Sequence, residues 1–210
     1  MTEHLTMNTV IHAAVRRDLA RFRRALQSFP VGSRQRADQL NSAWRHLDDQ
    51  LYHHHHGEET IFWPALRELG ADESLVADLN GEHERMAEAM THTRSAMSAL
   101  AAEPDQDALD KARAAVNTLQ EVITGHFAHE ERDLEPMMLA QSHTPQIKQA
   151  SKAIRKTQTL PSAGSFLAWV LDDADPQARA YVRHEIPKPV LFILARVFGR
   201  SYGRVAAAWQ

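Results

Sequence analysis

The chain has 210 residues, of which 43% are apolar and 24% charged, and its net charge is −3 when histidine is neutral. This composition is typical of an ordinary globular protein of one domain, and the charge balance excludes a typical nucleic-acid binder. Cysteine is absent, which excludes disulfides, zinc–thiolate sites and clusters held by four cysteines. We see no basic leader followed by an apolar segment and no apolar run of about 18 residues, so we expect no signal peptide, no membrane span and a cytoplasmic location.

Apolar residues in alternating steps of three and four predict a first helix over residues 7–27. Five arginines fall on its outer side, while its apolar stripe contains one histidine, His12. A Ser-Phe-Pro-Val-Gly segment breaks this helix, and Ser33 is a candidate N-cap for the next one. His12 therefore stands where a core residue belongs.

The second helix has the most regular pattern, with apolar positions in steps of four and three from residue 40 to residue 61. His54 and Glu58 occupy two of these positions, one turn apart, where leucine stands one turn earlier. We expect Pro64 to kink or loosen the helix just past this pair, and Gly70 to end it. A histidine and a glutamate so placed can both reach one metal ion, or two adjacent ions.

The third and fourth helices repeat this arrangement. The third is expected to start near Ser74, and its stripe again contains a histidine, His83. The stripe of the fourth helix includes His126 and Glu130, again one turn apart. Each of the four predicted helices therefore carries one histidine among its apolar residues.

The motif of the second helix returns in the fourth. Both copies read H-x-x-x-E-E-x-x-x-x-P, and the second lies 72 residues after the first (126 − 54 = 72). This repetition is a stronger sign than a single His/Glu pair, which arises easily by chance. The paired residues are His54 and His126, Glu58 and Glu130, and Pro64 and Pro136.

Four helices with short breaks and one apolar stripe each predict an all-α fold, with an up-down-up-down four-helix bundle over residues 1–140. The histidines lie early in the first and third helices and late in the second and fourth, so alternating directions bring them to one depth. After residue 140 prolines mark shorter helices, and the last stretch is apolar and basic. We expect residues 141–210 to form a helical extension packed on the bundle, which can also provide a homodimer contact.

Burying four imidazoles and two carboxylates at one level is costly unless cations neutralise them. Imidazole and carboxylate without thiolate suit iron, with manganese and zinc as competitors. A carboxylate can bridge two ions, whereas a single imidazole nitrogen cannot. We therefore predict Glu58 and Glu130 as bridging ligands, His12 and His54 on one ion, and His83 and His126 on the other.

This order, His…H-x-x-x-E…His…H-x-x-x-E on four helices, resembles the hemerythrin-like, or HHE cation-binding, domain family over about residues 5–140. The resemblance implies a non-haem centre of two iron ions joined by an oxo or hydroxo bridge, which meets O₂, peroxide or nitric oxide. Ferritin-like bundles need a Glu followed by a His at the third position, and no Glu in this chain has one, which argues against them.

One departure from that family guides the expected function. The oxygen-carrying members have H-x-x-x-H on the third helix, whereas here Ala87 stands four residues after His83. About two histidines per iron would then leave open positions, which favour substrate chemistry over reversible carriage. We therefore expect a redox enzyme that consumes hydrogen peroxide or nitric oxide. Two alternatives stay open: an O₂/NO-binding or iron-responsive sensor without turnover, and a purely structural metal site.

Several neighbouring residues have alternative roles. His55 and Glu59 form a rival ligand pair on the second helix, although their stripe runs through Asp48. Tyr52 can ligate iron or donate a proton, but packing in the core is the simpler expectation. The other polar residues of the two motifs are expected at the surface or holding ligand imidazoles in place. They are His53, His56, His129, Glu59 and Glu131.

Overall fold

The computed structural model describes residues 5–198 and 200–209, and within them all regular structure is helical. The first helix spans the range that the sequence predicts, and the Ser33 side chain accepts a hydrogen bond from the Arg36 backbone N–H, as expected of an N-cap. The four long helices are α1 (Met7–Gln27), α2 (Arg34–Gly57), α4 (Glu73–Ala102) and α5 (Gln106–His129).

Both motif helices change their winding at the motif glutamate. The π-helical turns η1 (Glu58–Phe62) and η2 (Glu130–Leu134) follow α2 and α5 directly, and the short helices α3 (Trp63–Glu68) and α6 (Glu135–Ala140) continue them. In both turns a backbone N–H bonds to the glutamate carbonyl five residues earlier. The proline that follows has no N–H to offer to the preceding turn, so the predicted loosening is confirmed at both places.

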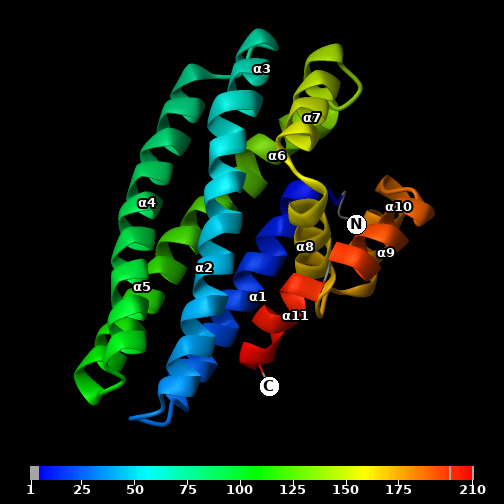
Figure 1. Ribbon diagram of the computed structural model, residues 1–210. Helices are drawn as coiled ribbons and strands as arrows, with labels where there is room; N and C mark the ends of the chain where they lie inside the picture. The colour runs from blue at the N-terminus through cyan, green and yellow to red at the C-terminus, as the bar shows by residue number, and fades with distance from the viewer. Residues whose placement is uncertain (1–4, 199, 210) are drawn as a thin grey trace.

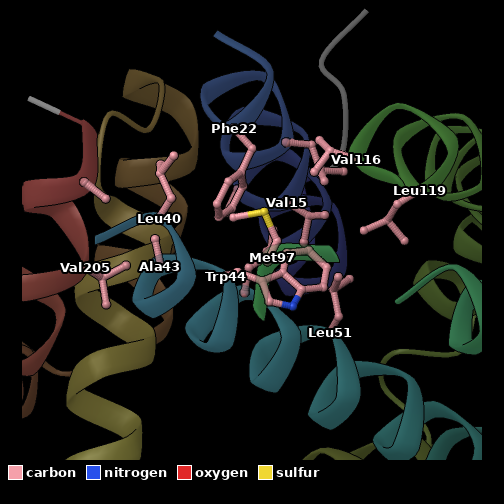
Figure 2. Close-up of a cluster of buried hydrophobic side chains, with 14 of the residues drawn as sticks. Val15, Phe22, Leu40, Ala43, Trp44, Leu51, Met97, Val116, Leu119 and Val205 are labelled. Carbon is pink, nitrogen blue, oxygen red and sulfur yellow. The ribbon is translucent and has the colours of Figure 1, made fainter. Parts of the chain in front are cut away.

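The four long helices lie side by side (Figure 1), with contacts between α1 and α2, α2 and α4, α4 and α5, and α1 and α5. Their apolar stripes meet in the middle, where Phe22, Trp44 and Met97 are fully buried (Figure 2). The ring centroids of Phe22 and Trp44 are 6.0 Å apart. This packed core fixes the helices on which the predicted ligands stand.

Further helices follow the bundle. Helix α7 contacts α3 and η1, α8 contacts α1, and α11 contacts α2. A buried hydrogen bond of 2.8 Å from Trp169 Nε1 on α8 to Asp18 Oδ2 on α1 joins the two parts. The helices are α7 (Pro145–Thr157), α8 (Leu160–Leu171), α9 (Pro176–Glu185), α10 (Lys188–Ile193) and α11 (Arg200–Ala206), with π-helical η3 (Leu194–Phe198) and 3₁₀-helical η4 (Ala207–Trp209).

The helices that follow residue 140 contact the long helices α1 and α2. Trp169, Tyr202 and Ala208 from the extension share one hydrophobic cluster with Phe22 and Trp44. The division into units of residues 1–140 and 141–210, and a homodimer contact through the extension, stay predictions. Each helix in the described part of the chain is too short or too polar to cross a membrane.

Candidate metal centre

The six predicted ligand residues come together between the four long helices. The Nε2 atoms of His12 and His54 are 3.3 Å apart, and those of His83 and His126 are 3.1 Å apart. Glu130 Oε2 lies 3.2 Å from His12 Nε2, and Glu58 Oε2 lies 3.6 Å from His83 Nε2. These residues are His12, His54, Glu58, His83, His126 and Glu130.

The donor atoms form two groups, in each of which all atoms lie within 4.8 Å of one another. Glu58 belongs to both groups and so stands in a bridging position. Each group can hold a metal ion. The first group is His12, His54, Glu58 and Glu130, and the second group is His55, Glu58, His83 and His126.

His55 is the addition that the predicted ligand set lacks. Its side chain is buried, and its ring centroid lies 4.5 Å from that of His83. The expectation that His54 and His55 are alternative registers is wrong, because adjacent residues point about 100° apart on a helix and each faces one group. Asp48, which counted against the His55 register, is buried but paired with Arg94 at 2.8 Å. Five imidazoles therefore surround the centre rather than the predicted four.

Buried donor atoms without partners test whether this set of residues fits a metal. Among the described residues, Glu58 Oε2, both carboxylate oxygens of Glu130 and His55 Nε2 are buried without a hydrogen bond. Such atoms cost about 1–3 kcal/mol each when unsatisfied, and more when charged. Cations placed between imidazole and carboxylate donors remove that cost, so the residues fit divalent or trivalent metal ions.

The pKa values of these groups reflect the same burial. Burial, followed by the charge of Glu130, raises the pKa of Glu58 well above its usual value. Burial also lowers the pKa of His54 and that of His55 well below the usual value. Neutral imidazole is the form that binds a metal, so low histidine pKa values leave these rings ready to act as ligands.

Carboxylates outside the centre hold three of the ligand rings. His12 Nδ1 donates to Glu131 at 2.9 Å and His83 Nδ1 donates to Glu59 at 2.8 Å, as expected for acids that orient ligands. With Nδ1 occupied in this way, each ring presents Nε2 to the centre. His126 Nδ1 donates to a residue that the sequence analysis missed, Glu82. Glu82 precedes His83 on α4 but belongs to neither copy of the repeated motif, so no sequence signal marked it.

Glu131 is further fixed by Arg16, whose guanidinium donates to both of its oxygens at 2.7 and 3.0 Å. Burial would raise the pKa of Glu131, but His12 and Arg16 together lower it to about 2. Burial also tends to lower the pKa of His12, yet Glu130 and Glu131 raise it overall. Arg16 thus keeps the Glu131 carboxylate ionised beside His12.

The two groups are related by an approximate two-fold symmetry. Residues 72 apart correspond on α2 and α5, and residues 71 apart correspond on α1 and α4 (83 − 12 = 71). The bond between His12 and Glu131 thus has its counterpart between His83 and Glu59. The symmetry fails beside the ligands, where His55 corresponds to Phe127. The Phe127 ring stacks on His12, with centroids 3.7 Å apart and an interplanar angle of 8°.

Tyr52 lies at the surface. Its side chain is 58% exposed and stacks on the exposed His56, with ring centroids 5.6 Å apart. The expectation that Tyr52 packs in the core is therefore wrong. His53 is exposed as well, and neither His53 nor His56 belongs to the two ligand groups, as expected.

Residues 9–104 match the family described as the hemerythrin HHE cation-binding domain. This segment belongs to that family. The matched hemerythrin segment contains His12, both candidate histidines of α2, Glu58 and His83, but it ends before α5 begins. No match was found among curated proteins or among solved structures. The contribution of His126 and Glu130 to the hemerythrin-like centre therefore rests on the geometry described above.

Proposed function

We propose that this hemerythrin-like chain holds two iron ions and consumes hydrogen peroxide or nitric oxide. The observation that carries the proposal is the pair of ligand groups that share Glu58. Imidazole and carboxylate ligands without thiolate are suited to iron. Bound iron supplies the change of oxidation state that no side chain of the ligand set can supply.

The remaining residues would hold and orient the two ions. His12 and His54 would bind one ion, and His55, His83 and His126 would bind the other. Glu58 would bridge them, while Glu130 lies 3.2 Å from His12 Nε2 and 3.6 Å from His126 Nε2 and can reach both sides. Unequal numbers of imidazoles would give the two ions different coordination.

Proton supply favours turnover over reversible O₂ carriage. The side chain of Glu59, hydrogen-bonded to His83 Nδ1, is 43% exposed, and that of Glu131, bonded to His12 Nδ1, is 31% exposed. Protons from solvent can therefore reach the ligand rings, whereas carriers must keep protons from bound oxygen. In peroxide disproportionation one peroxide takes two electrons and two protons and yields two waters. A second peroxide gives up those electrons and protons and yields O₂.

Oxygen evolution from hydrogen peroxide by the iron-loaded protein tests this function. We expect His54→Ala to abolish it, because the first group then has one imidazole left. His53→Ala is the matched control, since His53 is next to His54 in the chain but its side chain is exposed and lies outside both groups. Equal activity of the two variants, or no oxygen from the unmodified protein, contradicts peroxide disproportionation. Nitric oxide loss driven by peroxide is measured with an electrode on the same two variants.

Metal analysis with an ultraviolet–visible spectrum tests the cofactor separately. Two irons per chain and near-ultraviolet absorption of an oxo-bridged pair are expected. Zinc gives no such absorption. If the protein retains its metal but the spectrum does not respond to O₂, peroxide or nitric oxide, the metal has only a structural role.

A sensor of O₂ or nitric oxide without turnover is the second candidate, and two observations favour it. With His55 included, five imidazoles surround the centre, and the resemblance implies the same number for the oxygen-carrying members, whose third helix has a second histidine. Helix α7 also packs on η1, where Ile154 Cδ1 lies 2.6 Å from the place of a Cβ on Gly57, next to Glu58. A reversible O₂ spectrum without turnover, together with altered hydrogen exchange in α7, would favour this candidate.

We further propose the up-down-up-down order of helices and a cytoplasmic location. Short connections from α1 to α2, from α3, which continues α2, to α4, and from α4 to α5 support the order, because neighbours joined in this way run antiparallel. Fluorescence microscopy of a tagged chain tests the location, and an experimental structure tests the order.

A further inference from the structure

A pocket of about 220 Å³ lies between α2 and α4 and reaches two rings of the second group. His55 and His83, two of the three imidazoles of the second group, line it, and both are buried. The exposed Tyr52 and His56 lie at its outer end. Because one water occupies about 30 Å³ in the liquid, the pocket accepts molecules several times larger than water.

Ala87 provides the space for this pocket. It lines the pocket one turn after His83, at the position where the oxygen-carrying members have a second histidine. A larger side chain there would extend over the buried rings of His55 and His83. The fifth imidazole comes from α2 instead of α4, and α4 is left with a methyl group facing the pocket.

The corresponding position on the other side of the centre is closed. Arg16 stands on α1 where Ala87 stands on α4, because 87 − 71 = 16. Its guanidinium carbon lies 5.3 Å above the ring centroid of Phe127, which in turn stacks on His12 at 3.7 Å. The bonds from Arg16 to both oxygens of Glu131 fix this cover. A molecule approaching the first group from that side meets a guanidinium and a phenyl ring.

We propose that the pocket between α2 and α4 binds small alkyl hydroperoxides and hydrogen peroxide and brings them to the second group. Ala87 and Met90 offer apolar contact for a short alkyl chain. The Glu59 carboxylate and the Tyr52 hydroxyl offer hydrogen-bond partners for the –OOH group. The choice of a peroxide as the substrate rests on the proposed function. The side from which the substrate approaches is inferred from Ala87 and Arg16.

Substrate size tests the approach. Stopped-flow absorbance of the iron-loaded protein gives the rates of reaction with hydrogen peroxide and with tert-butyl hydroperoxide. We expect Ala87→Phe to slow the larger reagent by about tenfold or more, and the smaller one less, because the phenyl ring fills the pocket. Ala114→Phe is the matched control, since Ala114 is an exposed helical alanine on α5 outside the pocket. Equal rates in these two variants overturn the proposal. So does a third variant, Arg16→Ala, if it reacts faster with tert-butyl hydroperoxide while Ala87→Phe leaves that rate unchanged, because the reagent then approaches from the side of Arg16.

A second measurement does not depend on any reaction. The full chain is loaded with zinc, which is redox-inert, and labelled with ¹³C at the methionine methyl groups, and tert-butyl alcohol is added as an unreactive analogue. In NMR spectra we expect the chemical shift of the Met90 methyl group to change as tert-butyl alcohol is added. The chemical shift of Met97, which is buried outside the pocket, should stay constant. Ala87→Phe should abolish the shift. If Met90 does not respond, the pocket assignment is wrong, whereas a Met90 response without peroxide turnover contradicts only the proposed function.

Discussion

The two sides of the candidate metal centre share a symmetric pattern of four histidines but have unequal surroundings. On both sides a histidine of α1 or α4 is held through Nδ1 by the second glutamate of a motif. Beside the first group, however, stand Phe127 and Arg16, and beside the second group stand His55 and Ala87. The comparison shows that the repeated motif brings donor atoms to both groups, while unrepeated neighbours set how many imidazoles each group contains and what covers it.

A second difference lies one turn further out. On α5, His129 donates through Nδ1 to Glu82 at 2.9 Å, and its Nε2 lies 3.3 Å from Asp133. The residue of α2 that corresponds to His129 is Gly57, and Ile154 of α7 covers it. One side of the centre is therefore joined to solvent by polar groups, whereas the other is covered by the extension.

The largest effect is expected from the one ligand that both sides share. Glu58→Gln keeps the size of the side chain but removes the charge that lies between the two groups. We expect the metal content to fall from two ions per chain to one or none, measured by mass spectrometry of the metals. Glu84→Gln on the exposed face of α4 is the control. Two tightly held ions in Glu58→Gln would mean that Glu58 is no bridge.

Exchanging His55 and Phe127, the side chains that differ beside the two groups, should reverse the difference in metal affinity. His55→Phe gives the second group the surroundings of the first, and we expect its metal affinity to fall by about 100-fold or more, since even partners of ligands account for 10–100-fold. Phe127→His should add a donor beside His12. Competition with a coloured chelator measures both affinities, and His56→Phe is the exposed control. Unchanged affinity in His55→Phe would show that His55 is not a ligand.

Arg16 stands beside Glu131, whereas Ala87 takes the corresponding position near Glu59, so the two glutamates should contribute unequally to stability. The pKa of Glu131 is lowered to about 2, so this carboxylate stabilises the fold above its unfolded pKa of about 4.5, and that stabilisation is lost as the pH falls towards 2. After allowance for solvent screening, Glu131→Gln should cost about 1–2 kcal/mol at pH 7 in the metal-free protein.

Urea unfolding measures this effect, and Glu59→Gln provides the comparison. Glu59 bonds to His83 but has no arginine among its described partners, so a smaller loss is expected. The cost of Glu131→Gln should shrink between pH 4.5 and pH 3. A cost that does not change with pH would assign the effect to packing rather than to charge.

The smallest effect separates two glycines of the motif helices. Gly125 has nothing within 4 Å of an added Cβ, so Gly125→Ala should stabilise the protein by about 0.5–1 kcal/mol through helix propensity. At Gly57 the same Cβ would lie 2.6 Å from Ile154 Cδ1, and the shift of that side chain should offset the gain. Thermal unfolding of both variants tests this. Equal stabilisation would mean that α7 does not press on η1.

Much of the centre follows from the sequence alone. The apolar residues in steps of three and four predict α1 over the residues that it covers. The break after this helix predicts Ser33 as the N-cap of α2. The repeated motif predicts four side chains, and the histidines in the apolar stripes of the other two helices predict two more. All six do come together, because a histidine in an apolar stripe has to enter the interior together with its neighbours. For Glu59 and Glu131 the sequence left two places open, the surface or a bond to a ligand ring, and both form such a bond.

Periodicity by itself determined which face of each helix turns inward, since that depends only on the 3.6-residue repeat. It did not determine what packs against the flanks of that face. His55, Glu82 and Tyr52 lie at such flanks. The contact of His55 with His83 depends on how α2 packs against α4, and the bond between Glu82 and His126 depends on how α4 packs against α5, while Tyr52 is left at the surface. Only the tertiary structure decided that Ala87 leaves this space open and that Arg16 closes its counterpart, because such contacts join residues of different helices and depend on the distances between them.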